Sequence, residues 1–210
     1  MLSVGLTGGI ASGKSTVARM LEEKGAFLID FDVLTRKVEK PGTSTWKKIV
    51  DYFGEGILNE DQTINRNRLG SIVFHDREKL TRLNEIVHPD VFREWHILLS
   101  DLNENYPDKI IISDIPLLIE TGVQKKFDMI VLVYAPPRQQ VERLTKKLKC
   151  NPEEALQRLA SQMPIDEKIA QADIVIDNSG SLDKTKKSVD DLWIELVRRE
   201  KHNRTILSNS

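Results

Sequence analysis

Residues 8–16, GGIASGKST, combine the residue types that bind a chain of phosphates. The spacing from Gly8 to Ser15 is G-x-x-x-x-G-K-S, the pattern of a phosphate-binding loop. Such a loop turns its backbone N–H groups toward phosphate oxygens, and glycine permits the backbone angles and close approach that this requires. Lys14 would supply a cation to the β- and γ-phosphates, and the Ser15 hydroxyl is a hard oxygen ligand suited to Mg²⁺. The sequence therefore predicts a nucleoside triphosphate site.

The loop needs a strand before it and a helix after it, and the sequence supplies both. Residues 2–6 form a short apolar run typical of a buried strand, and residues 14–24 have helical periodicity that ends at Gly25. This context disfavours the simpler interpretation, a glycine turn with a surface lysine. Four further short runs predict strands: residues 26–29, 109–114, 129–134 and 172–177. We expect an α/β fold of the P-loop NTPase type, three αβα layers around a five-stranded parallel sheet.

Acidic residues stand at the ends of two predicted strands. Asp30 and Asp32 follow the second strand, and on an extended chain both side chains would point the same way. One of them could reach a metal or an acceptor hydroxyl, but a helix N-cap at Asp30 with a solvated neighbour explains the pattern equally well. Asp114 ends the third predicted strand, where a carboxylate helps to hold Mg²⁺ in proteins with a phosphate loop. The alternative for Asp114 is a turn residue.

Residues 35–105, between the second and third predicted strands, have mainly helical periodicity. We expect a helical insertion at the sheet edge where a second substrate would bind. His88-Pro89 is expected to join two helices, because proline disfavours the helical conformation of the residue before it. Both a structural histidine at a helix end and a catalytic histidine fit His88.

Residues 138–164 predict a pair of basic helices joined by a short loop. Such a pair could close over transferring phosphates as a lid, with Arg143 and Arg158 facing them. For any one basic residue here, a solvated charged face is the commoner explanation. The sheet core would then comprise three segments, residues 1–34, 106–137 and 165–210.

The composition of the 210 residues limits the classes of partner. Lys and Arg number 31 against 32 Asp and Glu, whereas nucleic-acid-binding proteins usually carry a basic excess. The single cysteine, Cys150, permits no internal disulfide and fits a reducing compartment. No apolar run reaches the length of a transmembrane helix. We expect a soluble, cytoplasmic protein, a monomer or small homo-oligomer, without nucleic-acid or membrane partners.

Taken together, these landmarks resemble the dephospho-CoA kinase family. The matching motifs follow the family order over nearly the whole chain: GLTGGIASGKST at 5–16, I-D-x-D at 29–32, L-N-x-I-x-H-P at 83–89, DIPLLIE at 114–120, Arg158 with QMP at 162–164, AD at 172–173 and DNSGS at 177–181. The phosphate loop alone is not specific, whereas the joint set is. Three positions depart from the family pattern: Lys147-Leu148 stands where Arg-Asp is usual, and Phe31 where alanine is common.

The resemblance implies transfer of the ATP γ-phosphoryl group to the 3′-hydroxyl of the dephospho-CoA ribose, the last step of coenzyme A synthesis. It implies a helical CoA-binding insertion and a lid, with Asp32 as the base and Asn178 and Gly180 on the adenine side. Lys14 is expected to be the second catalytic residue. The ATP-binding residues are expected to be Gly8, Gly9, Ala11, Ser12, Gly13, Lys14, Ser15, Thr16, Arg143, Arg158, Asn178 and Gly180. The substrate-binding residues are expected to be Asp32, His88, Pro116, Leu117 and Glu120, and the Mg²⁺ ligands Ser15 and Asp114.

Two other functions are compatible with a phosphate loop. The first is another P-loop nucleotide or small-molecule kinase, which acceptor specificity would distinguish. The second is a nucleotide-switch protein such as a GTPase, but the guanine-reading pattern N-K-x-D is absent from the sequence.

Overall fold

The computed structural model describes residues 1–73 and 76–208, with side chains described up to residue 205. The chain forms two compact units: residues 1–29 with the chain from residue 102 onward, and residues 30–101. The expected insertion, residues 35–105, corresponds mainly to the second unit. None of the described helices is both long and apolar enough to cross a membrane.

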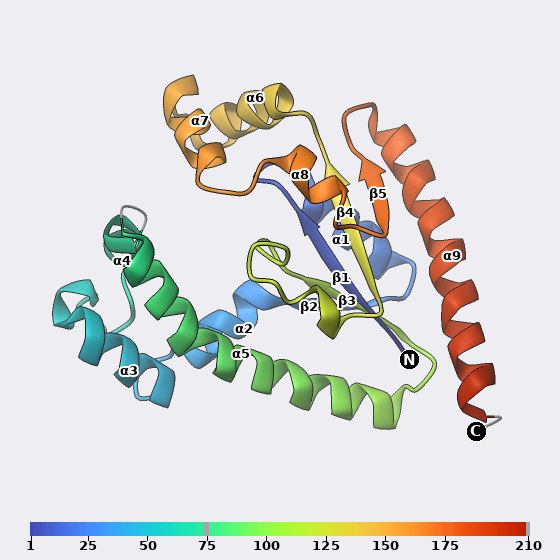
Figure 1. Ribbon diagram of the computed structural model, residues 1–210, viewed down its shortest axis with the longest axis horizontal. Helices are drawn as coiled ribbons and strands as arrows, with labels where there is room; N and C mark the ends of the chain where they lie inside the picture. The colour runs from blue at the N-terminus through green and yellow to red at the C-terminus, as the bar shows by residue number, and fades with distance from the viewer. Residues whose placement is uncertain (74–75, 209–210) are drawn as a thin grey trace. The chain divides into compact units, whose positions relative to one another are not determined.

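The first unit is built on a five-stranded sheet with the strand order β2-β3-β1-β4-β5 (Figure 1). The strands are β1 (Leu2–Gly8), β2 (Phe27–Asp30), β3 (Ile110–Asp114), β4 (Met129–Tyr134) and β5 (Ile174–Asp177). β1 pairs in parallel with β3 and β4, and β4 pairs in parallel with β5. Because these strands are parallel, their carboxyl ends lie at one edge, where ligands bind in open α/β sheets. The expected parallel P-loop sheet is confirmed.

The helical segments of this unit are α1 (Lys14–Glu23), η2 (Gln124–Lys126), α6 (Pro137–Leu148), α7 (Pro152–Ala160), α8 (Ile165–Ile169) and α9 (Leu182–Ser208). α1 and α9 pack against each other and against β1. The core under them consists of fully or nearly fully buried side chains, among them Val4, Leu6, Val17, Leu21, Ile112, Val131, Val189 and Leu196. On the other face, a Cβ at Gly5 would lie 2.5 Å from Leu118 Cδ1, so the segment after β3 packs directly on β1. Both faces of the central strand are therefore covered.

The second unit is helical: α2 (Phe31–Val38), α3 (Ser44–Phe53), η1 (Glu55–Ile57), α4 (Arg66–Val73) and most of α5 (Arg77–Asn105). Trp95 is 1% exposed and contacts Phe31 and Phe92 through tilted and edge-on ring packing. An aromatic cluster therefore joins α2 to α5.

The expected break at His88-Pro89 is wrong, because α5 is one helix with Pro89 inside it. Proline removes a helical hydrogen bond and crowds the carbonyl four residues earlier, at a cost of about 3 kcal/mol. Pro89 is exposed, so water can reach the freed carbonyl. The buried side chains of Val87 and Val91 flank it and keep both halves of the helix packed, which outweighs the local cost.

Candidate active site

The phosphate-binding loop connects β1 to α1 as the sequence predicts. The Ser12 N–H donates to the Gly9 carbonyl at 3.0 Å, and Ala11 (φ +57°) and Gly13 (φ +95°) both have left-handed backbone. Gly13 precedes α1, and its carbonyl accepts from the N–H of Thr16 at 2.9 Å. The first turn of α1 therefore opens onto the loop, and its N–H groups and positive dipole favour an anion there.

A Cβ at Gly8 would lie 2.8 Å from the Val133 carbonyl oxygen, and side chains of neighbouring segments crowd the other two glycines of the loop. A Cβ at Gly9 would lie 2.5 Å from Gln140 Oε1 of α6, and a Cβ at Gly13 would collide with Asn178 Nδ2, which follows β5. Gly13 also needs glycine for its positive φ. Glycine at these positions therefore lets the loop backbone pack directly against α6 and against the residue that follows β5.

Lys14 and Asp114 form an ion pair beside this loop. Lys14 is the first residue of α1, and Asp114 is the last residue of β3, paired in register with Leu6 of β1. Their side chains are only 15% and 11% exposed. The structure thus brings together the expected catalytic cation and an expected metal ligand, whereas the side chains of Ser15 and Thr16 are exposed in the first turn of α1.

The residues around this ion pair fit a Mg²⁺ ion that is shared with a nucleotide. Within the described residues there is no group of three or more His, Cys, Asp or Glu side chains that could hold a metal by itself. Mg²⁺ in kinases is usually held by one or two protein oxygens, substrate phosphates and water. The Ser15 hydroxyl and the Asp114 carboxylate are oxygen donors of this kind.

Arg143 and Asn178 follow β4 and β5, which lie on one side of β1 in the sheet, whereas Asp114 ends β3 on the other side. Arg143, in α6, donates to the Asn178 carbonyl at 2.7 Å and to the Ser12 carbonyl at 3.3 Å. The Asn178 side chain is buried and donates to the same Ser12 carbonyl at 2.7 Å. Both residues therefore contact the protein backbone around the loop, while Arg158 in α7 and Gly180 are exposed.

Pro116, Leu117 and Glu120 lie in the segment that follows β3. The Thr7 hydroxyl donates to the Pro116 carbonyl at 3.2 Å, which ties this segment to β1, and Leu117 is 40% exposed. Glu120 pairs with the fully buried Lys168 of α8, with 2.6 Å between Oε1 and Nζ. The segment is thereby held at both ends, and the Glu120 charge is compensated inside the protein.

Asp30, Asp32 and His88 belong to the second unit. Asp30 is the N-cap of α2, where its Oδ1 accepts from the N–H groups of Asp32 at 2.8 Å and Val33 at 3.3 Å. The chain is therefore not extended through Asp32, which is exposed in the first helical turn. This structure agrees with the N-cap interpretation of Asp30.

His88 is half-buried in α5, with its ring edge-on to Phe92. Burial lowers the pKa of His88 below its ordinary value of 6.5, because the charged imidazolium loses solvation. Because the charged form is disfavoured, His88 suits hydrogen bonding better than charge pairing.

Three residues make contacts that the sequence did not predict. Gln162, after α7, accepts from the Ile10 N–H at 3.0 Å; Gln140 of α6 contacts Gly9; and Lys168 pairs with Glu120. Gln162 belongs to one of the motifs quoted above, but no local pattern indicates that it binds a residue 152 positions earlier.

The fold and this geometry define a class of protein. A glycine-rich loop between the central strand of a parallel sheet and a helix, with Lys14 beside the Asp114 carboxylate, is the nucleotide site of the P-loop NTPase class of proteins.

Comparison with known proteins gives the family. The profile of the dephospho-CoA kinase family matches residues 2–184, so the chain belongs to this family. A dephospho-CoA kinase from Syntrophus aciditrophicus is 51% identical over 210 residues, covering 100% of this chain and 89% of that protein.

Two solved structures are similar over nearly their whole length. TT1252 from Thermus thermophilus is 33% identical, with a TM-score of 0.79 and coverage of 92% of this chain and 96% of that one. A dephospho-CoA kinase from Campylobacter jejuni is 26% identical, with a TM-score of 0.68 and coverage of 93% and 96%.

Proposed function

We propose that this protein transfers the γ-phosphoryl group of ATP to the 3′-hydroxyl of the dephospho-CoA ribose, which gives coenzyme A and ADP. One observation carries the proposal: a complete phosphate-binding loop with its Lys14–Asp114 pair lies in a chain that matches the dephospho-CoA kinase family over residues 2–184.

Phosphoryl transfer depends on positioning and on stabilisation of developing charge more than on covalent chemistry. In this proposal backbone N–H groups of the loop, among them that of Gly13, hold the phosphates. Lys14 exchanges its contact with Asp114 for the β- and γ-phosphate oxygens. Ser15 and Asp114 would hold Mg²⁺, which when bound neutralises charge on those oxygens.

Asp32 is the proposed base, which orients the ribose hydroxyl or accepts its proton. The structure supports this role in one respect: the cap of α2 is made by Asp30, so the Asp32 carboxylate is not used as the cap. His88, Pro116, Leu117 and Glu120 are proposed to bind the acceptor.

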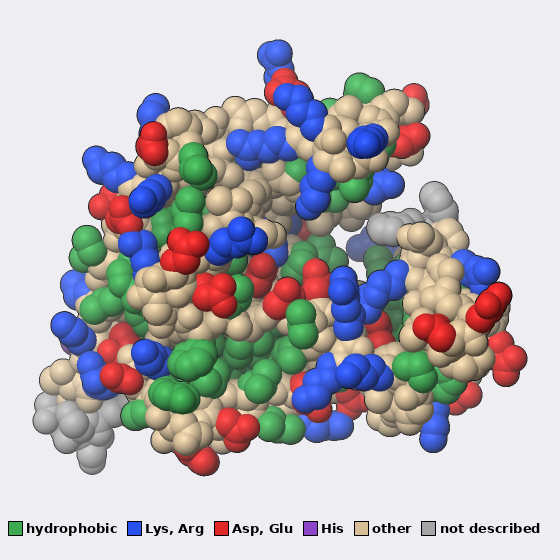
Figure 2. All heavy atoms as spheres, turned by 180° about the vertical axis from the view of Figure 1, so that it is seen from behind, with side chains coloured by type: hydrophobic (Ala, Val, Ile, Leu, Met, Phe, Trp, Pro, Cys, Tyr) green, Lys and Arg blue, Asp and Glu red, His purple; other side chains and the backbone are tan. Residues whose placement is uncertain are grey.

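The helices α6 and α7 are the proposed lid. Their sequences include Arg138, Arg143, Lys146, Lys147 and Arg158. Lys and Arg side chains are also seen at the top of the face in Figure 2. Positive charge here complements the phosphates of ATP. Lysine at position 147 offers a point charge rather than the bidentate fork of arginine.

We also infer that the enzyme works in the cytoplasm, because Cys150 is a free cysteine and the substrates are small molecules of metabolism.

The direct test is an assay of ADP release with dephospho-CoA as acceptor, with AMP, CMP and no acceptor run in parallel. The proposal predicts rapid turnover when dephospho-CoA is the acceptor, and little ADP release with AMP, with CMP or without an acceptor. Phosphorylation of AMP or CMP without phosphorylation of dephospho-CoA would identify a different kinase of the same fold.

A further inference from the structure

The carbonyl of Ser12 is an internal acceptor immediately before α1. Ser12 is fully buried, and because it precedes the helix, its carbonyl is not part of the α1 hydrogen-bond ladder. It accepts instead from Asn178 Nδ2 at 2.7 Å and, at a longer 3.3 Å, from Arg143 Nη1. A buried carbonyl without a hydrogen-bond partner is destabilising, so this loop conformation depends on these two side chains.

The chemistry of its partners sets the orientation of the Asn178 amide. The Ser12 carbonyl can only accept, so the side of the amide that faces it must be the NH₂ group. The amide oxygen then faces the Thr185 hydroxyl at 2.7 Å, which must donate. Thr185 is fully buried in the first part of α9 and cannot contact a nucleotide. It therefore contributes to the site only through Asn178.

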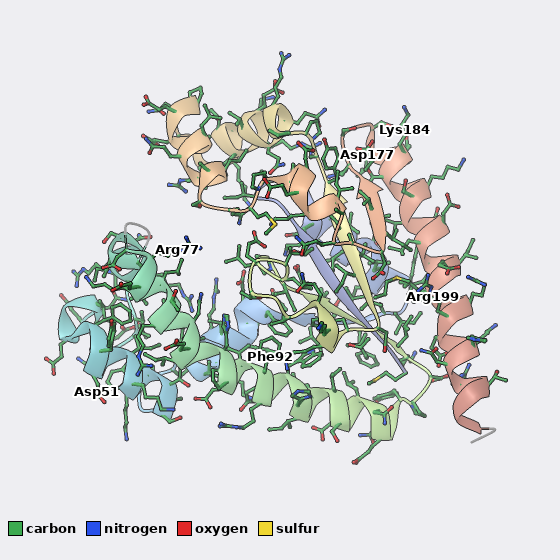
Figure 3. The ribbon with its side chains drawn as sticks, in the orientation of Figure 1. Asp51, Arg77, Phe92, Asp177, Lys184 and Arg199 are labelled. Atoms are coloured by element: carbon green, nitrogen blue, oxygen red, sulfur yellow. The ribbon has the colours of Figure 1, made fainter. Side chains whose placement is uncertain are left out.

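The backbone of Asn178 is fixed as firmly as its side chain. Its N–H donates to the Tyr134 carbonyl at 2.8 Å, which continues the pairing of β5 with β4, and its carbonyl accepts from Arg143. Figure 3 labels Asp177 and Lys184, which precede and follow Asn178 in the sequence, where β5 is joined to α9. With 9% of its surface exposed, Asn178 is a rigid connection between the sheet and the loop.

The Asn178 hydrogen bond fixes the direction of a neighbouring N–H group. In a trans peptide the C=O and the N–H point in opposite directions. Since Asn178 holds the Ser12 carbonyl on its own side, the N–H of Gly13 points the opposite way, away from Asn178. Gly13 N–H is one of the donors with which the loop motif surrounds phosphate oxygens. Any Cβ at Gly13 would collide with the Asn178 amide, so the two residues are matched in shape.

We propose that Asn178 is a positioning residue of the phosphate-binding loop: it holds the Ser12–Gly13 peptide so that the Gly13 N–H serves the phosphates. Thr185 keeps the Asn178 amide in the required orientation. The inference uses one part of the proposed function, namely that the loop binds a chain of phosphates. It differs from a direct contact of Asn178 with adenine, because its effect on affinity comes entirely from the phosphates.

The test measures affinity for ATP and for inorganic tripolyphosphate, which has the phosphates but no nucleoside. Calorimetry on the full chain would compare wild type, Asn178→Ala and Thr185→Val, with Mg²⁺ present. We expect Asn178→Ala to weaken both ligands by the same factor, roughly tenfold for one lost hydrogen bond. Thr185→Val should weaken the binding of ATP and of tripolyphosphate by equal factors, and this factor should be smaller than that for Asn178→Ala. Thr185→Val also provides the test if Asn178→Ala does not fold.

Asp173→Ala is the matched control at the other end of β5. Asp173 Oδ2 accepts from the Ile130 N–H at 2.6 Å, so this variant also loses one bond between a side chain and the backbone. It should lower the melting temperature and leave both affinities unchanged.

Four results would overturn the proposal: loss of ATP affinity with tripolyphosphate affinity intact, no loss for either ligand, an equal loss in Asp173→Ala, or a wild type that binds ATP but not tripolyphosphate. If the protein phosphorylates a different acceptor, the proposed function fails but this inference does not, because neither ATP nor tripolyphosphate binding involves the acceptor.

Discussion

Lys14 and Asp114 neutralise each other between the first turn of α1 and the end of β3, with side chains 15% and 11% exposed. Each charge compensates the other, and removal of one partner of a largely buried pair is costly. Both groups are needed elsewhere in the proposed reaction, Lys14 on the phosphates and Asp114 on the metal. Binding of Mg²⁺ with ATP therefore exchanges one set of charge contacts for another.

This exchange predicts the behaviour of Asp114→Asn. The variant loses a metal ligand, so the Mg²⁺ concentration for half-maximal turnover should rise by roughly tenfold or more, the range found when metal-site partners are changed. It also frees Lys14 from its carboxylate, so affinity for ATP in the presence of EDTA should stay the same or increase. A magnesium titration of turnover and calorimetry in EDTA measure the two effects. An unchanged Mg²⁺ requirement with weaker metal-free binding would show that Asp114 only orders the loop.

Lys14→Met should lower turnover by about 10²-fold or more, because the γ-phosphate loses one preorganised cation as charge develops. Lys24→Met is the control, since Lys24 follows the same helix and pairs with Asp190. The coupled ADP-release assay should give near wild-type rates for Lys24→Met. Near wild-type turnover in Lys14→Met would remove Lys14 from the catalytic residues.

The aspartates at the start of α2 can be separated by two isosteric changes. Asparagine caps helices as well as aspartate does, so Asp30→Asn should retain the N-cap, stability and activity. Asp32→Asn removes the proposed base, so kcat should fall by roughly 10²–10⁴-fold while the affinity for ATP is retained. Steady-state kinetics and ATP calorimetry distinguish the outcomes. Equal losses of ATP affinity and turnover in Asp32→Asn would make Asp32 a structural or metal-shell residue.

The phosphate-binding loop could be predicted from the sequence because its chemistry is local. The spacing of Gly8, Gly13 and Lys14 reflects backbone angles and reach within one turn of chain, and the flanking strand and helix have clear periodicity. The strand order could not be predicted in this way, since nothing in the sequence near β2 indicates that β2 lies at the sheet edge beyond β3.

The parts that the sequence could not supply depend on distant partners. Asn178 and Ser12 are 166 residues apart, and their hydrogen bond has no periodic signal. The continuity of α5 through Pro89 is a related case, in which burial of residues such as Trp95 outweighs a local helix breaker. Local rules identify the loop, whereas tertiary packing decides what holds it.

His88 gives the second unit a predicted pH dependence. Burial lowers its pKa below 6.5, so the unfolded chain binds a proton more readily than the folded one. The stability that neutral His88 contributes is fully present above pH 6.5 and is lost as the pH falls from that value through the lower pKa of the folded protein. The melting temperature of wild type minus that of His88→Gln should therefore decrease between pH 7.5 and 5.5. Burial raises the pKa of Glu39, but Glu39 is present in both proteins, so its contribution cancels in the difference of melting temperatures. A difference that stays constant or grows toward acid would contradict this assignment.

The central claim is that the ATP γ-phosphoryl group is transferred to one hydroxyl of dephospho-CoA. The most direct measurement incubates the wild-type chain with ATP, Mg²⁺ and dephospho-CoA, and locates the new phosphate in the product by mass spectrometry and phosphorus NMR. We predict coenzyme A, with a phosphomonoester on the ribose 3′-hydroxyl and one ADP per product. Release of ADP and inorganic phosphate with dephospho-CoA unmodified, or phosphate at another position, would contradict the account.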